Sequence, residues 1–134
     1  MFLEVKGLTK EYKRNDSVFA AVAGVNLSVS PADFISITGR SGSGKSTLLN
    51  MIAGLLTPTS GSIEIDGQDI SALSDKEASL VRNSKIGYIP QGQSVLANFT
   101  VLDNVRLPFY LFKRQGDATE KALSLLAQGG IPHL

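Results

Sequence analysis

Apolar and polar residues alternate along the first thirty positions with the period of β-strands. In residues 2–6 (FLEVK), and again at Val25, Leu27 and Val29, every second side chain is apolar. This alternation is typical of strands that bury one face. The polar run 13–17 (KRNDS) lies between the two patterns. We therefore predict two half-buried N-terminal strands connected by a polar loop.

The pattern changes after residue 32. Residues 33–38 (DFISIT) form a short apolar run that is typical of a strand buried in the centre of a sheet. From Gly44 onward the apolar residues follow the spacing of one helix face, and Gly54 and Pro58 mark the end of that helix. The apolar face consists of Leu48, Leu49, Ile52, Leu55 and Leu56. The sequence thus predicts a strand, a glycine-rich loop and an amphipathic helix in that order.

A hairpin and a short helix are predicted next. Residues 61–70 (GSIEIDGQDI) alternate and then turn at Asp66–Gly67, which is a strong hairpin signal. Ser74 and Glu77 have the spacing of a capping box, so we expect a helix from here to about Asn83. The hairpin indicates an antiparallel element.

Helices are predicted for most of the remaining chain. Residues 85–90 (KIGYIP) read as one more short strand. Residues 101–112 are apolar enough for a buried helix, broken or kinked at Pro108. A second capping pattern at 117–120 (DATE) begins a helix that ends at Gly129–Gly130. Strands therefore dominate the first part of the chain and helices the second.

Composition limits the classes of protein. A chain of 134 residues, 43% of them hydrophobic, can bury the core of a single domain. The net charge of +1 gives no reason to expect nucleic acid or an anionic membrane as a partner. The sequence has no cysteine, which excludes disulfides and thiolate metal sites. We see neither a secretory signal nor an apolar run of the roughly 20 residues that span a bilayer, and we expect a cytoplasmic chain.

The glycine-rich loop carries the clearest chemistry. Residues 39–46 (GRSGSGKS) match the phosphate-loop pattern G-x-x-x-x-G-K-[ST]. Glycines let the backbone curl around an anion, and the start of the following helix adds partial positive charge. Lys45 can reach the β- and γ-phosphates, and the Ser46 hydroxyl can coordinate Mg²⁺. The candidate nucleotide-binding residues are Gly39, Arg40, Ser41, Gly42, Ser43, Gly44, Lys45, Ser46 and Thr47.

The loop alone does not separate the classes of phosphate-loop protein. A GTPase would be expected to contain an N-K-x-D string, which does not occur in the sequence. Residues 62–66 (SIEID) end in an acid and could imitate a strand that holds Mg²⁺, but their alternation and the following Gly67 favour a half-exposed hairpin. We find no candidate acceptor site for a small kinase.

Four ordered segments resemble one family. Residues 39–71 are similar to the N-terminal half of an ATP-binding cassette (ABC) transporter ATPase, with its helix, P-T-S-G turn and I-x-I-D-G hairpin. Residues 86–91 (IGYIPQ) resemble the Q-loop of that family, 99–108 the segment after it, and 8–12 (LTKEY) the region with the adenine-stacking aromatic. The sequences of these segments are most similar to the branch of lipoprotein-release and macrolide-export ATPases.

The resemblance implies a fold and a domain organisation. The expected fold class is α/β, a truncated phosphate-loop NTPase of the ABC type. It would have a mixed sheet with N-terminal antiparallel strands, a core phosphate-loop strand and helix, and the start of a helical subdomain. Residues 1–91 would form the ATP-binding core, and 92–134 the beginning of the helical subdomain.

The resemblance also implies roles for single residues. Tyr12 would stack on adenine, 39–46 would hold the phosphates, Lys45 would contact the terminal ones, and Ser46 and Gln91 would ligate Mg²⁺. A tyrosine ring can stack on any base, and a Gln carbonyl is a hard, neutral ligand for the metal. On the residues alone, Tyr12 could instead cover a sheet edge, and Gln91 could be a solvent-facing turn residue.

The implied partners are ATP, Mg²⁺ and membrane-spanning permease subunits. In the family, two copies pack head to tail, so a homodimer or pseudo-dimer is expected, peripheral at the inner face of the membrane. We therefore expect a subunit that binds Mg-ATP and couples its hydrolysis to export.

Several family motifs do not occur in the sequence. Residues 127–134 (AQGGIPHL) contain the one Gly-Gly pair but no L-S-G-G-Q signature, and no apolar run ends in Asp-Glu. His133 does not match the switch histidine of the family. We therefore expect an N-terminal fragment and assign no catalytic residue. The alternative is a nucleotide-binding or interaction fragment that does not hydrolyse ATP.

The aromatic cluster Phe109, Tyr110 and Phe112 is predicted to be core of the helical subdomain rather than a docking surface. His133, the only histidine, is predicted to be inert.

Overall fold

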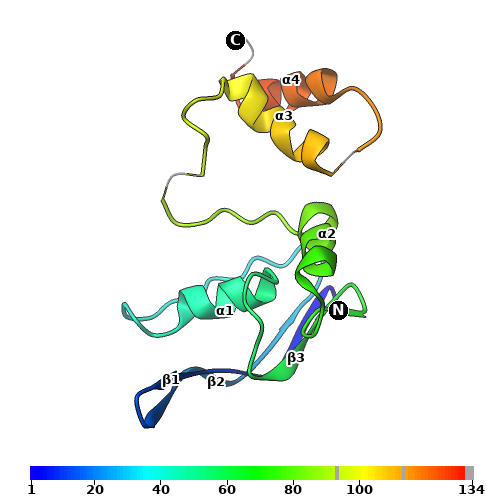
Figure 1. The fold of residues 1–134 in the computed structure, drawn as a ribbon. Helices are drawn as coiled ribbons and strands as arrows, with labels where there is room; N and C mark the ends of the chain where they lie inside the picture. The colour runs from blue at the N-terminus through cyan, green and yellow to red at the C-terminus, as the bar shows by residue number, and fades with distance from the viewer. Residues whose placement is uncertain (93, 113, 132–134) are drawn as a thin grey trace. The chain divides into compact units, whose positions relative to one another are not determined.

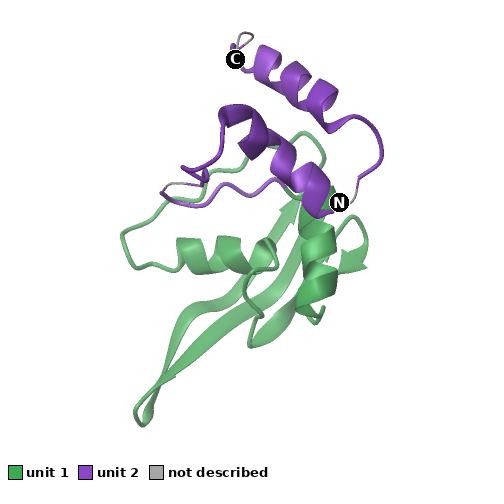
Figure 2. Ribbon diagram, turned by 45° about the horizontal axis from the view of Figure 1, so that its top comes forward, with its two compact units in different colours: residues 1–86 green, residues 87–134 purple. Residues whose placement is uncertain are grey.

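The chain divides into two compact units, residues 1–86 and 87–134 (Figure 2). The structure, a computed structural model, describes residues 1–92, 94–112 and 114–131. His133, predicted to be inert, lies outside the described residues. The first unit contains the sheet and two helices, and the second contains two further helices.

A four-stranded antiparallel sheet forms the base of the first unit (Figure 1). Its strands are β1 (Leu3–Arg14), β2 (Ser17–Val29), β3 (Ser60–Ile65) and β4 (Gln68–Asp69), in the order β2-β1-β3-β4. The two N-terminal strands confirm the prediction and extend beyond the alternating pattern. They form one long hairpin that turns at residues 15–16, because Arg14 pairs with Ser17.

The second hairpin is also confirmed. Strands β3 and β4 pair antiparallel, and the turn residues Asp66 and Gly67 have φ of 51° and 76°. Positive φ at both central residues is what a tight two-residue hairpin requires. The Asp66 carboxylate accepts a hydrogen bond of 2.8 Å from Lys85 Nζ, and this bond holds its pKa below the usual range. Residues 62–65 are therefore part of a hairpin strand that turns at Asp66, and the acidic metal-strand alternative is wrong.

Helix α1 (Lys45–Ile52) packs on one face of this sheet and supplies two of the buried residues. The core of the unit consists of Val5, Leu8, Val22, Leu48, Met51, Ile63, Ile65, Ile70 and Val81. Burial of an aliphatic side chain of this size stabilises the fold by about 1.5–3 kcal/mol. The predicted helix face was partly wrong: Leu49 and Leu55 are 45% and 49% exposed, whereas Met51 is buried. The helix ends at Ile52, so Leu55 lies outside it.

The strand expected at 33–38 is not formed. Phe34 and Ile35 are 95% and 46% exposed, and only Ile37 of this run packs against the core. A strand needs a neighbour for its hydrogen-bond ladder, and in the described ladders no residue pairs with this segment. The chain therefore reaches the loop without regular secondary structure.

Helix α2 (Asp75–Lys85) confirms the capping box and corrects the strand prediction that followed it. The Ser74 hydroxyl accepts from the Glu77 N–H, and the Glu77 carboxylate accepts from the Ser74 N–H at 3.0 Å. The helix continues to Lys85, two residues beyond the expected end. Residues 86–90 form no strand, and Ile89 is 87% exposed. Their apolar character alone does not supply a pairing partner.

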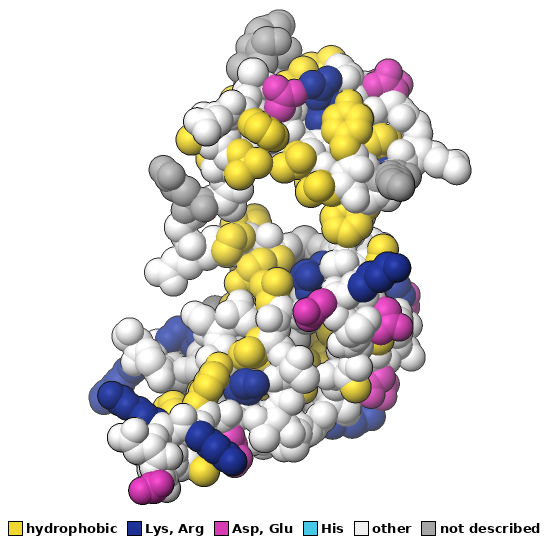
Figure 3. All heavy atoms as spheres, in the orientation of Figure 1, with side chains coloured by type: hydrophobic (Ala, Val, Ile, Leu, Met, Phe, Trp, Pro, Cys, Tyr) yellow, Lys and Arg dark blue, Asp and Glu magenta, His cyan; other side chains and the backbone are white. Residues whose placement is uncertain are grey.

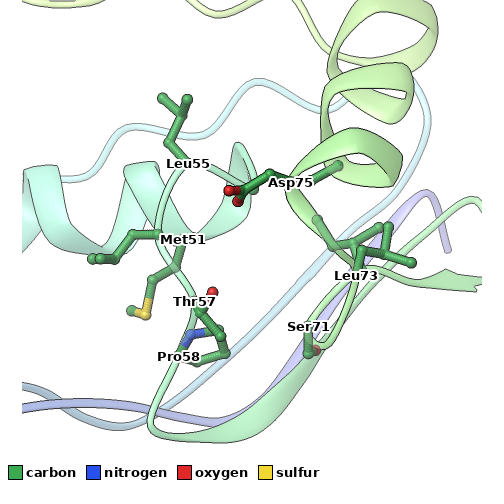
Figure 4. A pocket seen from close by; sticks show the side chains of 11 residues that line it. Met51, Leu55, Thr57, Pro58, Ser71, Leu73 and Asp75 are labelled. Atoms are coloured by element: carbon green, nitrogen blue, oxygen red, sulfur yellow. The ribbon is translucent and has the colours of Figure 1, made fainter.

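A small cavity lies between the end of α1 and the start of α2 (Figure 4). Its volume is about 30 Å³, which leaves room for little more than a water molecule. The labelled lining residues are Met51, Leu55, Thr57, Pro58, Ser71, Leu73 and Asp75. The cavity is a packing feature of the unit, too small for an organic ligand.

The second unit contains α3 (Val101–Leu111) and α4 (Ala118–Gln128). The predicted N-cap of α4 is confirmed, because the Asp117 carboxylate accepts from Thr119 N–H and Glu120 N–H. Pro108 lies inside α3, which continues to Leu111 and is not broken there.

The burial predicted for this region was wrong. No residue of α3 is buried, and the buried residues in the described part of the unit are Ala118, Ala122 and Leu126 of α4. Phe109 and Tyr110 make an edge-to-face contact with ring centroids 6.1 Å apart. Tyr110 is nevertheless 57% exposed, because two short helices by themselves leave most of their apolar surface uncovered. Of the helices that the structure describes, none combines the length and apolar character needed to cross a bilayer.

Candidate nucleotide-binding site

The glycine-rich loop connects segment 33–38 to the N-terminus of α1 (Figure 1). Gly44 is the N-cap of the helix, and no side chain caps this end. The first turn also contains no acidic residue. The first backbone N–H groups of a helix lack partners within the helix and favour an anion. The start of α1 is therefore suited to phosphate.

Only glycine fits at position 44, because the loop passes close to the sheet there. Its φ of 92° lies in the left-handed region, which favours glycine. A Cβ atom at this position would lie 2.2 Å from the carbonyl oxygen of Ala21 in β2. No side chain fits there without movement of backbone. The contact sets the height of the loop above the sheet.

Lys45 turns back into the loop. Its ammonium group donates to the carbonyl oxygens of Gly39 at 2.8 Å and Arg40 at 2.6 Å. A third hydrogen bond goes to the Ser43 hydroxyl at 3.2 Å. The positive charge is thus held within the curve of the loop by weak, neutral acceptors. Phosphate oxygens are stronger acceptors for an ammonium group, so an entering anion can replace them.

Tyr12 lies at the same site as the loop. It lines a cavity of about 310 Å³ together with residues 42–47. The other lining residues are Phe19 and Ala21 of β2. Tyr12 is 43% exposed, so its ring is accessible to a ligand. The structure brings together the predicted aromatic and the predicted phosphate loop from positions thirty residues apart.

A second cavity of about 280 Å³ lies at the loop, lined by Gly39, Ser43 and Lys45 together with residues 21–23 of β2. Among the described residues that line either cavity, none is an aspartate or glutamate. The electrostatic character of the site is therefore set by Lys45 and by the helix terminus.

Phe19 was missed by the sequence analysis. It is the register partner of Tyr12, and its side chain is 60% exposed. A signal was present, because a hairpin that turns at residues 15–16 places position 19 opposite position 12. The loop predicted over residues 13–17 hides this pairing, because β1 extends to Arg14 and β2 begins at Ser17.

Gln91 lies in the second unit, where it is exposed. Its role as a Mg²⁺ ligand beside Ser46 stays a prediction. Ser46 is exposed in the first turn of α1, and its hydroxyl is a hard oxygen ligand of the type that Mg²⁺ prefers. In the described part of the chain no three His, Cys, Asp or Glu side chains gather to hold a metal. A Mg²⁺ ion here would take its remaining ligands from phosphate and water.

Comparisons with known proteins agree on the family. A family model described as ABC transporter matches residues 22–134. The chain is 36% identical to the lipoprotein-releasing system ATP-binding protein LolD of Pseudomonas syringae pv. tomato, over 98% of this chain and 58% of the relative. It is 38% identical to LolD of Geobacter metallireducens, over 98% of this chain and 59% of the relative. These relatives confirm the resemblance to the lipoprotein-release branch.

A solved structure gives the same answer for the fold. The ATP-binding cassette MJ0796, in a dimeric post-hydrolysis state bound to ADP and Pi, superposes with a TM-score of 0.84 at 38% identity. The alignment covers 93% of this chain and 56% of that chain. The predicted α/β fold class of the ABC type is confirmed, apart from the unpaired segment 33–38.

The chain spans between 56% and 59% of the lengths of these proteins. The family match itself covers most of the residues, including the loop, both hairpin strands β3 and β4, and all four helices. The alignments to the LolD relatives extend over 98% of the chain, well beyond the loop. The chain therefore belongs to the ABC transporter family.

Proposed function

We propose that this chain is the ATP-binding part of an ABC export subunit, which binds Mg-ATP at residues 39–47. The observation that carries the proposal is the arrangement of Lys45. Its ammonium group is held inside the loop by Gly39, Arg40 and Ser43, directly at the uncapped start of α1. A lysine and a helix N-terminus that converge on one point form an anion site.

The residues present fit a nucleoside triphosphate with its metal. Lys45 and the first N–H groups of α1 would hold the phosphates, the Ser46 hydroxyl would contribute to Mg²⁺, and Tyr12 would lie under the base. Gln91 would add a second Mg²⁺ ligand. When bound, the metal would neutralise phosphate charge at the site. The similarity to LolD proteins and to MJ0796, which was solved with ADP and Pi, supports the same ligand class.

For the complete subunit we propose that ATP hydrolysis drives export through membrane-spanning permease subunits. Two nucleotide-binding chains would pack together, as in the dimeric MJ0796 structure. The subunit would lie at the inner face of the membrane through its permease partners. The lipoprotein-releasing relatives favour export over import.

A second candidate is binding without turnover by this chain alone. Hydrolysis needs a group that positions the attacking water. Both cavities at the loop are lined, within the described residues, by no carboxylate. The loop and Lys45 supply charge stabilisation, which favours binding but does not by itself activate water.

Equilibrium dialysis with Mg-ATP tests the proposal. We expect the 134-residue chain to retain ATP, and Lys45→Ala to lose most of this binding because the ammonium charge is removed from the loop. Lys6→Ala is the matched control, since Lys6 is an exposed lysine paired with Glu4 in the same unit. If wild type and Lys45→Ala retained equal amounts of ATP, the proposal would be wrong. Phosphate release that Lys45→Ala abolishes would exclude the non-hydrolysing candidate.

A further inference from the structure

Two aromatic side chains face the loop from neighbouring strands. Tyr12 of β1 and Phe19 of β2 are direct register partners near the end of the long hairpin. Directly paired residues of antiparallel strands project from the same face of the sheet. Both rings are accessible, with exposed fractions of 43% and 60%. Exposed aromatic rings at adjacent positions form a surface on which a flat ligand can lie.

This surface is continuous with the candidate phosphate site. Tyr12 and Phe19 line the same cavity of about 310 Å³ as Lys45, Ser46 and Thr47. A ligand that places phosphates at the start of α1 can therefore reach both rings. A nucleotide has this chemistry, with an anionic end and a planar heteroaromatic base.

One face of the Tyr12 ring is already covered. The Lys10 ammonium group lies 5.5 Å from the ring centroid, a cation–π distance. The same group donates to the carbonyl oxygen of Thr57 at 2.7 Å, which fixes it in place. A base can then stack on only the other face of Tyr12. Further aromatic contact must come from another residue, and Phe19 is the aromatic that shares the cavity with Tyr12.

We propose that Phe19 forms a second wall of the base subsite and contributes binding energy to the base but not to the phosphates. This inference rests on the proposed function, because it requires a nucleotide in the loop. It assigns a role to a residue outside the phosphate loop and outside the segment 8–12. Stacking on an aromatic ring is tolerant of base identity, so Phe19 raises affinity for nucleotides in general.

Isothermal titration calorimetry with two ligands separates base binding from phosphate binding. The ligands are Mg-ATP and Mg-tripolyphosphate, and the variant is Phe19→Ala. We expect the variant to bind Mg-ATP about tenfold more weakly, as is typical when one aromatic stacking contact is removed. Binding of Mg-tripolyphosphate should not change. Phe19→Trp should keep the affinity of the wild type for Mg-ATP.

Val18→Ala is the matched control. Val18 is the next residue of β2, is 59% exposed, and points to the other face of the strand. We expect it to bind both ligands as the wild type does. Its substitution tests for a general effect of shortening an exposed apolar side chain near the hairpin end.

The outcomes distinguish this inference from the proposed function. If Phe19→Ala bound Mg-ATP with unchanged affinity, the inference would be overturned while the function remained. An equal loss for both ligands would show that Phe19 acts through the folding of the hairpin, which also overturns it. If the wild-type chain bound neither ligand, the proposed function itself would fail.

Discussion

At Gly44 the loop passes so close to β2 that a single methyl group decides the local structure. An alanine there would adopt an unfavourable left-handed conformation, and its Cβ would meet the Ala21 carbonyl oxygen at 2.2 Å. We expect Gly44→Ala to lower the free energy of unfolding by roughly 2–4 kcal/mol, the sum of backbone strain and overpacking. Urea unfolding followed by circular dichroism measures this loss.

Gly42→Ala provides the control for Gly44. Gly42 has φ of 78°, but a Cβ there would meet nothing within 4 Å. Only the strain of the left-handed backbone contributes here, so we expect Gly42→Ala to lower the free energy of unfolding by about 1–2 kcal/mol. If the two variants were equally stable, the contact between loop and β2 would not restrain Gly44.

At the scale of elements, the capping box of α2 makes a measurable contribution to the stability of the first unit. The Ser74 hydroxyl caps the Glu77 N–H. We expect Ser74→Ala to destabilise the first unit by about 1 kcal/mol, measured as a shift of the urea midpoint. Ser79→Ala is the control, because the Ser79 hydroxyl donates to the Lys76 carbonyl oxygen of the same helix and does not cap its N-terminus. The control should leave the midpoint nearly unchanged.

The same capping box makes the stability of α2 dependent on pH. The pKa of Glu77 is lowered, first by its hydrogen bond with the Ser74 hydroxyl and then by that with the Ser74 N–H. A lowered pKa means that the contribution is complete above the unfolded pKa of about 4.3. It is lost as the pH falls through the lower pKa of the folded state. The difference in thermal midpoint between wild type and Glu77→Ala should therefore be constant from pH 7 to about pH 5 and shrink below about pH 4.

Asp103 provides a comparison for this pH dependence. Its pKa is also lowered, mainly by the Thr100 hydroxyl and then by Arg106. It lies in the first turn of α3 in the second unit, where its carboxylate accepts from the hydroxyl of Thr100, the N-cap. The Asp103→Ala substitution should not change how the difference in thermal midpoint with and without Glu77→Ala varies with pH. A difference between wild type and Glu77→Ala that persisted at pH 3 would contradict the assignment.

At the scale of the whole molecule, apolar side chains remain on the surface of both units, as the face in Figure 3 shows. Phe34 is the extreme case in the first unit, with 95% of its area exposed. We expect Phe34→Ser to change the free energy of unfolding by less than about 0.5 kcal/mol, because it removes no packing contact. The variant should also self-associate less, which sedimentation velocity measures.

Leu8→Ala provides the comparison for a fully buried side chain. Leu8 is 0% exposed in the centre of the core, so its truncation should cost about 2–5 kcal/mol. If Phe34→Ser destabilised the unit as much as Leu8→Ala, the segment 33–38 would have packing partners in solution. Equal self-association of Phe34→Ser and wild type would show that this side chain does not mediate association.

Features with local causes were predictable from the sequence. The turn at Asp66–Gly67, the capping box of Ser74 and the N-cap of α4 depend on residues within a few positions of one another. The phosphate loop and the start of α1 were predicted for the same reason, since glycine, lysine and the helix start are contiguous. The face of α1 was less well predicted, because burial depends on where the sheet lies.

The sequence by itself determined the hairpins, the helix starts, the phosphate loop and the family resemblance. Turns, caps and contiguous motifs each depend on residues that are close together in the sequence. Only the tertiary structure decided that residues 33–38 and 86–90 form no strand, since an apolar run becomes a strand only where a neighbouring strand completes its hydrogen-bond ladder. It also decided that Phe19 joins Tyr12 at the loop, because their meeting depends on the register of a hairpin and on the packing of α1 against it.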